Sequence, residues 1–164
     1  MQTRSKDFWK LFKPSACSLK LKASTQDGVF EEITSLLVKS KQLDPSLAEE
    51  AVTAFKEREL LASTGVGSGV AIPHTKLAGL ETPIFSLCLA PEGLEWNSVD
   101  GEKAQIFFGV LRPDRPSETF DPDRHLDMMR WISSLARVAD FRRFALAVST
   151  RKELVDLLKE MSNA

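Results

Sequence analysis

The sequence contains no tyrosine, two histidines and two cysteines among its 164 residues. Cys17 and Cys88 lie far apart along the chain, so they form neither a disulfide framework nor a metal site. We expect both to be small hydrophobic side chains in a reducing compartment. His74 and His125 are the only two residues with an imidazole side chain. Any chemistry that needs imidazole therefore has to use one or both of them.

Long hydrophobic runs and an excess of one charge are also lacking. No stretch approaches the roughly 18 apolar residues that a transmembrane helix needs. No small-residue cleavage site follows the basic N-terminus, so we expect a cytoplasmic protein. The 22 basic side chains balance 23 acidic ones, which gives a net charge of -1. Because nucleic acids are bound through a clear basic excess, this balance argues against a nucleic-acid partner.

The length and composition are those of one ordinary domain. A chain of 164 residues, 43% of them hydrophobic, buries about 70% of its unfolded surface and needs no disulfide or metal to hold its core. No repeat, linker or low-complexity tract divides the chain, so we predict a single domain over residues 1–164. Helical and strand patterns alternate loosely, which predicts an α/β sandwich with helices against a small mixed sheet.

Hydrophobic periodicity predicts where the helices and strands lie. We expect five helices, which begin near residues 24, 44, 125, 140 and 150. Apolar runs predict three strands, at 70–72, 84–90 and 105–111, and two further segments have loop chemistry, 63–69 and 112–124. Ser24 and Asp27 have the spacing of a capping box, Asp140 is expected to cap its helix, and Leu126 is expected on a buried helix face.

The N-terminal segment, residues 1–14, mixes lysines with large apolar side chains. Its apolar members are Phe8, Trp9, Leu11 and Phe12. Two interpretations are open: a turn that packs on the core, or a helix that docks on a membrane surface or a protein partner.

Three glycines, Gly65, Gly67 and Gly69, alternate within the expected loop at 63–69. The pattern is not a dinucleotide fingerprint, which needs the order strand, loop, helix, and the chain has no P-loop sequence. A flexible backbone with unhindered N–H groups, beside the hydroxyls of Ser63 and Thr64, suits a small anion such as phosphate. The alternative is a surface turn whose glycines serve its geometry.

His74 directly follows Pro73 at the end of the strand expected at 70–72, close to the glycine loop. The unperturbed pKa of histidine is about 6.5, so most rings are neutral at pH 7 and one ring nitrogen is nucleophilic without an activating base. A neutral histidine beside an anion-binding loop is what a phosphohistidine site requires. The alternative is a histidine with a structural role.

His125 and Arg58 are the candidate partners of His74. His125 opens an expected helix, where a neutral ring and the free helix N–H groups can donate to phosphoryl oxygens; otherwise it is a polar cap. Arg58 ends the second expected helix and can clamp a phosphate with two hydrogen bonds; otherwise it lies on a solvated face. A zinc site needs three or four protein ligands, and the two histidines could be joined only by Asp121 or Asp123 as a third. We therefore expect no metal and no other cofactor.

The stretch RELLASTGVGSGVAIPH, from Arg58 to His74, resembles the signature of type-2 enzyme IIA domains of the phosphoenolpyruvate-dependent phosphotransferase system. These are the fructose, mannitol and nitrogen-regulatory IIA proteins. The resemblance continues through residues 96–101 and His125-Leu126, and it covers the chain from about Phe8 onward. It implies a compact three-layer α/β/α sandwich that accepts a phosphoryl group from a histidine phosphocarrier, HPr or its nitrogen-branch paralogue.

The resemblance also implies roles for three residues: His74 as the phosphoryl acceptor, His125 as the second active-site histidine and Arg58 as the active-site arginine. Thr75 and Asn97 depart from the usual residues of the family, and the 112–124 loop is longer than typical. Two outputs remain open. One is regulation of target proteins by phosphorylation state, favoured because no IIB or IIC domain is fused to this chain. The other is transfer to the cysteine of a separate IIB subunit for sugar uptake.

Overall fold

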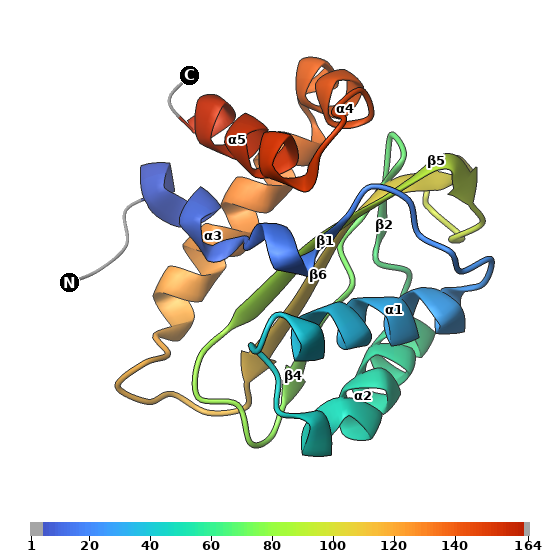
Figure 1. Ribbon diagram of the computed structural model, residues 1–164. Helices are drawn as coiled ribbons and strands as arrows, with labels where there is room; N and C mark the ends of the chain where they lie inside the picture. The colour runs from blue at the N-terminus through green and yellow to red at the C-terminus, as the bar shows by residue number, and fades with distance from the viewer. Residues whose placement is uncertain (1–4, 163–164) are drawn as a thin grey trace.

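The computed structural model describes residues 5–162, and residues 1–4 of the N-terminal segment lie outside the described part (Figure 1). The helices are α1 (Gln26–Lys39), α2 (Ala48–Leu61), α3 (Pro122–Ala136), α4 (Ala139–Ala145), α5 (Arg151–Ser162), and the 3-10 helices η1 (Ser5–Leu11), η2 (Pro14–Ala16) and η3 (Pro45–Leu47). The strands are β1 (Cys17–Ser18), β2 (Gly65–Gly67), β3 (Val70–Ala71), β4 (His74–Leu77), β5 (Ile84–Leu94) and β6 (Ala104–Pro113).

The strands form one mixed sheet in the order β1-β5-β6-β3-β2, and β4 also pairs with β6. β6 is antiparallel to β5 and parallel to both β3 and β4. β3 pairs with β6 at Ile106 and Phe107, whereas β4 pairs with it from Val110 onward. The two short strands therefore follow one another along the same side of β6, and the break between them falls at Ile72 and Pro73.

Helices cover both faces of the sheet (Figure 1). On one face α1 and α2 enclose a core in which Phe30 stacks on Phe55 at 5.4 Å and meets Trp96 edge-on at 5.6 Å. On the other face α3, α4, α5 and η1 enclose a second core that contains Phe108 and Phe141. This arrangement confirms the predicted three-layer α/β/α sandwich with a small mixed sheet.

The N-terminal segment packs on the core in its described part. Phe8 is 2% exposed and Phe12 is 1% exposed. The Phe12 ring lies 5.3 Å from Phe85 and 6.0 Å from Phe108, measured between ring centroids. Of the two interpretations of this segment, the described residues therefore show the turn packed on the core, because its aromatic side chains are used inside the molecule.

The start of α1 corrects the expected capping box. The N-cap is Thr25, whose hydroxyl accepts a hydrogen bond from the N–H of Gly28 at 3.1 Å, so the predicted pair of Ser24 and Asp27 is wrong. A one-residue error of this kind arises because serine and threonine are equally suited to the N-cap and stand side by side here. In α4 the N-cap is Val138, and Asp140 lies inside the first turn.

The start of α3 also differs from the prediction. The helix begins at Pro122 and is capped by Asp121, whose side chain accepts from the N–H of Asp123 at 3.0 Å. His125 lies one turn into the helix, and its own N–H donates to the carbonyl of Asp121. The backbone of His125 is therefore not free to bind an anion. Leu126 is 49% exposed, so its expected burial is wrong, and Met128 is buried instead. Ile132, which shares the hydrophobic periodicity of this helix, is buried as that pattern predicts.

The expected loop at 63–69 is largely a β-hairpin. Gly65 and Gly67 belong to β2, which is antiparallel to β3, and the reversal passes through Ser68 and Gly69 at φ 56° and 81°. Glycine has a low strand propensity, so sequence pattern alone indicates a loop. Pairing with β3, whose own partner is the central strand β6, overrides that propensity.

Candidate functional site

His74 is held at the start of β4, immediately after the break between β3 and β4. The N–H of Ile72 donates to the carbonyl of Thr64, and the carbonyl of Pro73 accepts from the N–H of Val110, both at 2.9 Å. His74 itself pairs with Val110 in the sheet. The prediction that His74 ends a strand is thus corrected: it begins one, and backbone hydrogen bonds on both sides of the break fix its position.

The ring of His74 has one nitrogen committed and one available. Its Nδ1 lies 2.6 Å from the carbonyl oxygen of Ile72. A carbonyl oxygen can only accept, so Nδ1 carries the proton and Nε2 carries the lone pair. Burial lowers the pKa of His74 below its ordinary value, and the charges of Arg58 and Arg112 add to that effect, against the hydrogen bond to Ile72 and the charge of Glu59. His74 is therefore neutral at pH 7, with a free nucleophilic nitrogen.

His125 faces the same site from α3. Its ring lies 5.6 Å from Phe120, edge-on, and 6.4 Å from Phe85. Burial lowers the pKa of His125 to about 4, and the charges of Arg112 and His74 contribute to the same shift. Its Nδ1 atom is buried without a hydrogen-bond partner. The structure thus brings the two histidines within electrostatic reach of each other and keeps both neutral.

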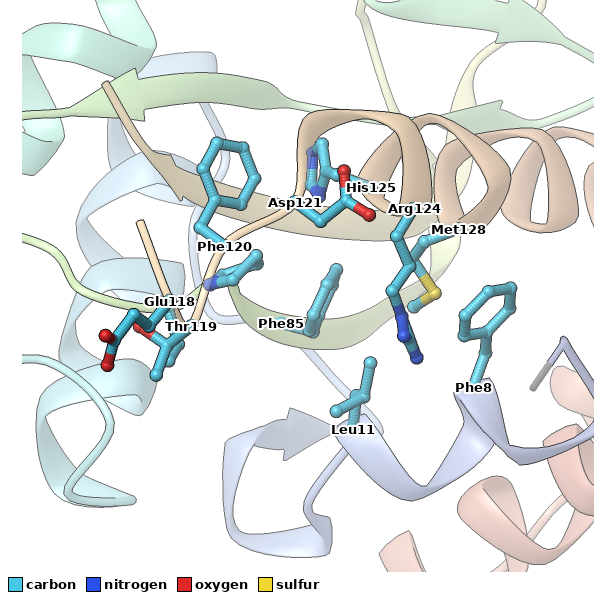
Figure 2. A pocket seen from close by; sticks show the side chains of 12 residues that line it. Phe8, Leu11, Phe85, Glu118, Thr119, Phe120, Asp121, Arg124, His125 and Met128 are labelled. Atoms are coloured by element: carbon cyan, nitrogen blue, oxygen red, sulfur yellow. The ribbon is translucent and has the colours of Figure 1, made fainter. Parts of the chain in front are cut away.

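A cavity of about 670 Å³ opens beside His125. Figure 2 shows the rings of Phe85, Phe120 and His125 around it, with Arg124 and Asp121 nearby. His74 is not among the residues that line it. The cavity therefore lies beside His125, and two of its aromatic walls, Phe85 and Phe120, contribute to the burial that lowers the pKa of His125.

Arg58 approaches His74 from the C-terminal end of α2. Its Nη1 donates to the carbonyl of Ala62 at 2.8 Å, which caps the end of the helix. The guanidinium is close enough for its charge to lower the pKa of His74. Arg58 is always protonated and has five N–H donors. The donors that do not bind Ala62 can therefore bind an anion held at His74.

Ser63, Thr64 and Gly65 are engaged in a hydrogen-bond network within the protein. Glu59 accepts from both the N–H and the hydroxyl of Thr64 at 2.6 Å, and that hydroxyl accepts from the indole N–H of Trp96 at 3.1 Å. The hydroxyl of Ser63 donates to the carbonyl of Trp96 and accepts from the N–H of Gly65. These contacts fix Thr64, whose carbonyl accepts from the N–H of Ile72, so they position His74 through the backbone.

Gly67 and Gly69 are not brought to His74. The carbonyl of Gly69 accepts from the N–H groups of Gln105 and Ile106, four residues along β6 from the partner of His74, a separation of about 13 Å. The N–H of Ser68 donates to the carboxylate of Asp100 at 2.8 Å. This hydrogen bond, with that from Glu102, lowers the pKa of Asp100. The turn does bind an anion, but that anion is a side chain of the same protein.

Two charged residues near His74 were missed by sequence reasoning. Glu59 anchors Thr64, and Arg112 acts electrostatically on both histidines. The apolar run ends at Leu111, which predicts that Arg112 begins a loop. In the structure β6 continues through Arg112 to Pro113. Glu59 lies beside Arg58 within the motif that ends at His74, so its position in the motif was an available signal. Arg112 gave no such signal, because both histidines on which it acts are distant from it in the sequence.

Within residues 5–162, no group of three or more His, Cys, Asp or Glu side chains is arranged to hold a metal ion. Among the same residues no helix is long and apolar enough to cross a membrane. The two cysteines are free and buried, and burial raises the pKa of each thiol to about 12.

Two relatives and one solved structure illustrate what the chain is similar to. A nitrogen regulatory protein of Pseudomonas aeruginosa is 26% identical over 154 residues, which cover 94% of this chain and 96% of the relative. A fructose-specific EIIABC component of Bacillus subtilis is 24% identical over 151 residues, which cover 92% of this chain and 23% of that longer protein. The crystal structure of the nitrogen regulatory protein IIA-Ntr from Neisseria meningitidis has the same fold, with a TM-score of 0.80, 24% identity and coverage of 92% and 97%.

A protein-family comparison covers nearly the whole chain. Residues 10–161 match the family described as phosphoenolpyruvate-dependent sugar phosphotransferase system, EIIA 2. The matched region includes both histidines, Arg58 and every strand of the sheet. The chain therefore belongs to the type-2 EIIA family of the phosphoenolpyruvate-dependent phosphotransferase system.

Proposed function

We propose that this protein is a phosphocarrier in which His74 accepts a phosphoryl group from a histidine phosphocarrier, HPr or its nitrogen-branch paralogue, and regulates target proteins according to its phosphorylation state. The observation that carries the proposal is the hydrogen bond between Nδ1 of His74 and the carbonyl of Ile72, which leaves Nε2 as a neutral nucleophile. Membership of the EIIA family supports phosphoryl transfer in general.

The transfer needs no general base. The lone pair of Nε2 forms the new N–P bond as the bond between phosphorus and the donor nitrogen breaks, and that electron pair stays on the donor's ring. The attacking nitrogen carries no proton, so none has to leave. The hydrogen bond from Nδ1 to Ile72 stabilises the positive charge that the His74 ring gains. Arg58 and a neutral His125 then stabilise the added negative charge.

The surface beside Arg58 supports a protein as the phosphoryl donor. Leu60 and Leu61 are 86% and 82% exposed at the end of α2. Apolar side chains grouped on a surface indicate a contact with another molecule. A histidine phosphocarrier that covers these leucines would lie beside Arg58, whose charge reaches His74.

The regulatory output is supported by the relative from Pseudomonas aeruginosa, a nitrogen regulatory protein matched over 96% of its length. A second candidate function is favoured by the fructose-specific relative from Bacillus subtilis. In that case His74 would pass its phosphoryl group to the cysteine of a separate IIB subunit. The two functions share the first step and differ in what receives or senses the phosphoryl group.

The first step is tested with radiolabelled phosphoenolpyruvate, enzyme I and the histidine phosphocarrier. We expect a label that is labile in acid and stable in base on the wild-type protein. His74→Ala should carry no label, whereas His125→Gln should be labelled more slowly. A label that persists in His74→Ala would falsify the assignment of His74 as the acceptor.

The two outputs are separated by a second experiment on the labelled protein. Addition of purified IIB domains should remove the label if the protein is a sugar-specific subunit. For the regulatory function, affinity purification with His74→Ala and His74→Asp should recover a partner outside the phosphotransferase system whose binding differs between the two variants. Rapid transfer to IIB without such a partner would favour the sugar-uptake function.

A further inference from the structure

Arg112 shares a face of the sheet with His74. The register pairs His74 with Val110 and Lys76 with Arg112, between the parallel strands β4 and β6. Side chains alternate along a strand, so positions 110 and 112 point to the same face, and so do 74 and 76. Val110 belongs to the core covered by α3, the helix that carries His125. Arg112 therefore projects on the side of the sheet where the two histidines lie.

Among residues 5–162, the guanidinium of Arg112 has one hydrogen bond, to the carbonyl of Pro113. Two residues of an extended strand span about 6.6 Å, a distance that an arginine side chain can bridge. Nη1 donates to the carbonyl of Pro113 at 3.0 Å, which orders a half-buried side chain. An arginine has five N–H donors, so others remain for an incoming acceptor. The charge of Arg112 reaches both His74 and His125.

No carboxylate within residues 5–162 forms an ion pair with Arg112 or with Lys76. The residue opposite Arg112 in the register is a second cation, Lys76. From α2 the site receives Arg58 and Glu59, and the Glu59 carboxylate is already bound to Thr64. A half-buried cation without a counter-charge costs free energy, so this position is arranged for an anion that arrives from outside.

We propose that Arg112 is a second phosphoryl-binding residue, which contacts the dianionic phosphoryl group on His74 from β6 while Arg58 contacts it from α2. The proposal rests on the proposed function of His74. Arg112 moves no proton: the N–P bond forms and the donor's bond to phosphorus breaks as described above, and the guanidinium only offsets negative charge. Two guanidinium groups then match the two charges of the phosphoryl group.

The proposal gives Arg112 a function in each state of the protein. Before transfer its positive charge helps to keep both histidine rings unprotonated. After transfer the same charge stabilises the dianion and lowers the second pKa of the phosphoryl group. One residue therefore favours both the reactive form of His74 and the product.

The test compares Arg112→Gln with the wild type and with Arg115→Gln. Arg115 is a matched control because its side chain is 86% exposed and lies three residues further along the chain. Each protein is phosphorylated with phosphoramidate, a small donor that needs no docking surface. For Arg112→Gln we expect about tenfold slower labelling of His74. We also expect the phosphorus NMR titration of phosphohistidine to have a midpoint higher by about half a pH unit or more.

Arg115→Gln should match the wild type in both measurements. The proposal is overturned if Arg112→Gln has the wild-type rate and the wild-type titration midpoint. Failure of the wild type itself to be labelled on His74, by phosphoramidate or by the phosphocarrier, would instead contradict the proposed function.

A measurement on the wild type covers the case in which Arg112→Gln does not fold. The side-chain Nε–H resonances of Arg112 and Arg115 are followed by NMR before and after phosphorylation. Contact with the phosphoryl group predicts a large shift for Arg112 and a small one for Arg115. Equal small shifts for the two residues would overturn the proposal.

Discussion

The Nδ1 atom of His74 lies 2.6 Å from the carbonyl oxygen of Ile72, two residues earlier in the chain. Ile72 is fixed in turn, because its N–H donates to the carbonyl of Thr64. The tautomer of the reactive ring is therefore set by the backbone on which the ring is mounted. A neighbouring carboxylate is not needed for this, and burial keeps the pKa of the ring below its ordinary value.

This hydrogen bond predicts which ring nitrogen is phosphorylated. Nδ1 carries the proton, so the phosphoryl group should be attached to Nε2. Nitrogen NMR of the free protein at pH 7 should show the Nδ1–H tautomer for His74, and the phosphorylated protein should show phosphorus coupling to Nε2. Coupling to Nδ1 would mean that the contact with Ile72 is broken during the reaction.

Stability should fall as the pH is lowered from about 6.5 to about 4, in part because of His125. The pKa of His125 is lowered to about 4 in the folded protein, so in this range the unfolded chain binds a proton that folded His125 does not. Allowing for solvent screening of a half-buried ring, the loss is on the order of 1–2 kcal/mol. Urea unfolding of the wild type and His125→Gln at pH 7.5 and pH 4.5 measures it.

The free energy of unfolding of the wild type should decrease more than that of His125→Gln between these two pH values. Other titrating groups, His74 and the carboxylates included, are present in both proteins and cancel in the comparison. Equal decreases in the two proteins would show that His125 titrates normally when folded.

Thr64→Val should destabilise the protein by about 1–3 kcal/mol. The substitution removes the hydroxyl that accepts from the indole N–H of Trp96 and donates to Glu59, and Thr64 is 3% exposed. The fully buried indole N–H of Trp96 would lose its acceptor, and the half-buried Glu59 would keep only the N–H of Thr64. Thr64→Ser keeps the hydroxyl and is the control. Urea unfolding should rank the proteins wild type, Thr64→Ser, Thr64→Val, and equal losses for the two variants would exclude the hydroxyl as the cause.

Gly69→Ala should reduce stability without slowing phosphorylation of His74. Gly69 has a φ of 81°, where an alanine is strained by about 1–2 kcal/mol. The turn is at the far end of the hairpin from His74, and its anion is the Asp100 side chain. Thermal unfolding and the labelling rate should be measured on the same preparation. If folded Gly69→Ala is labelled clearly more slowly than the wild type, the turn at Gly69 contributes to phosphoryl binding and this prediction is wrong.

The sequence singled out candidate site residues by residue type, whereas several of the segments around them differ from the prediction. The motif from Arg58 to His74 and the second histidine are local facts of residue type, and the structure brings His74, His125 and the charge of Arg58 together. The glycine hairpin was expected to be a loop near His74, because propensity describes a residue and its neighbours and contains nothing about pairing with a distant strand. The start of α1 shifted because Ser24 and Thr25 are adjacent and either can act as the cap. The start of α3 shifted because Asp121 caps the helix and Pro122 begins it, one turn before His125.

By itself the sequence determined the chemistry that is available: two imidazoles, no metal-binding spacing, no basic excess and a motif typical of one family. Only the tertiary structure decided which groups meet. The register of β4 against β6 sets Arg112 on the face that His74 occupies. Gly69 binds β6 at Ile106, about 13 Å along that strand from Val110, the partner of His74. Strand register is a relation between segments far apart in the chain, so it is decided by the packing of the whole sandwich and not by any local pattern.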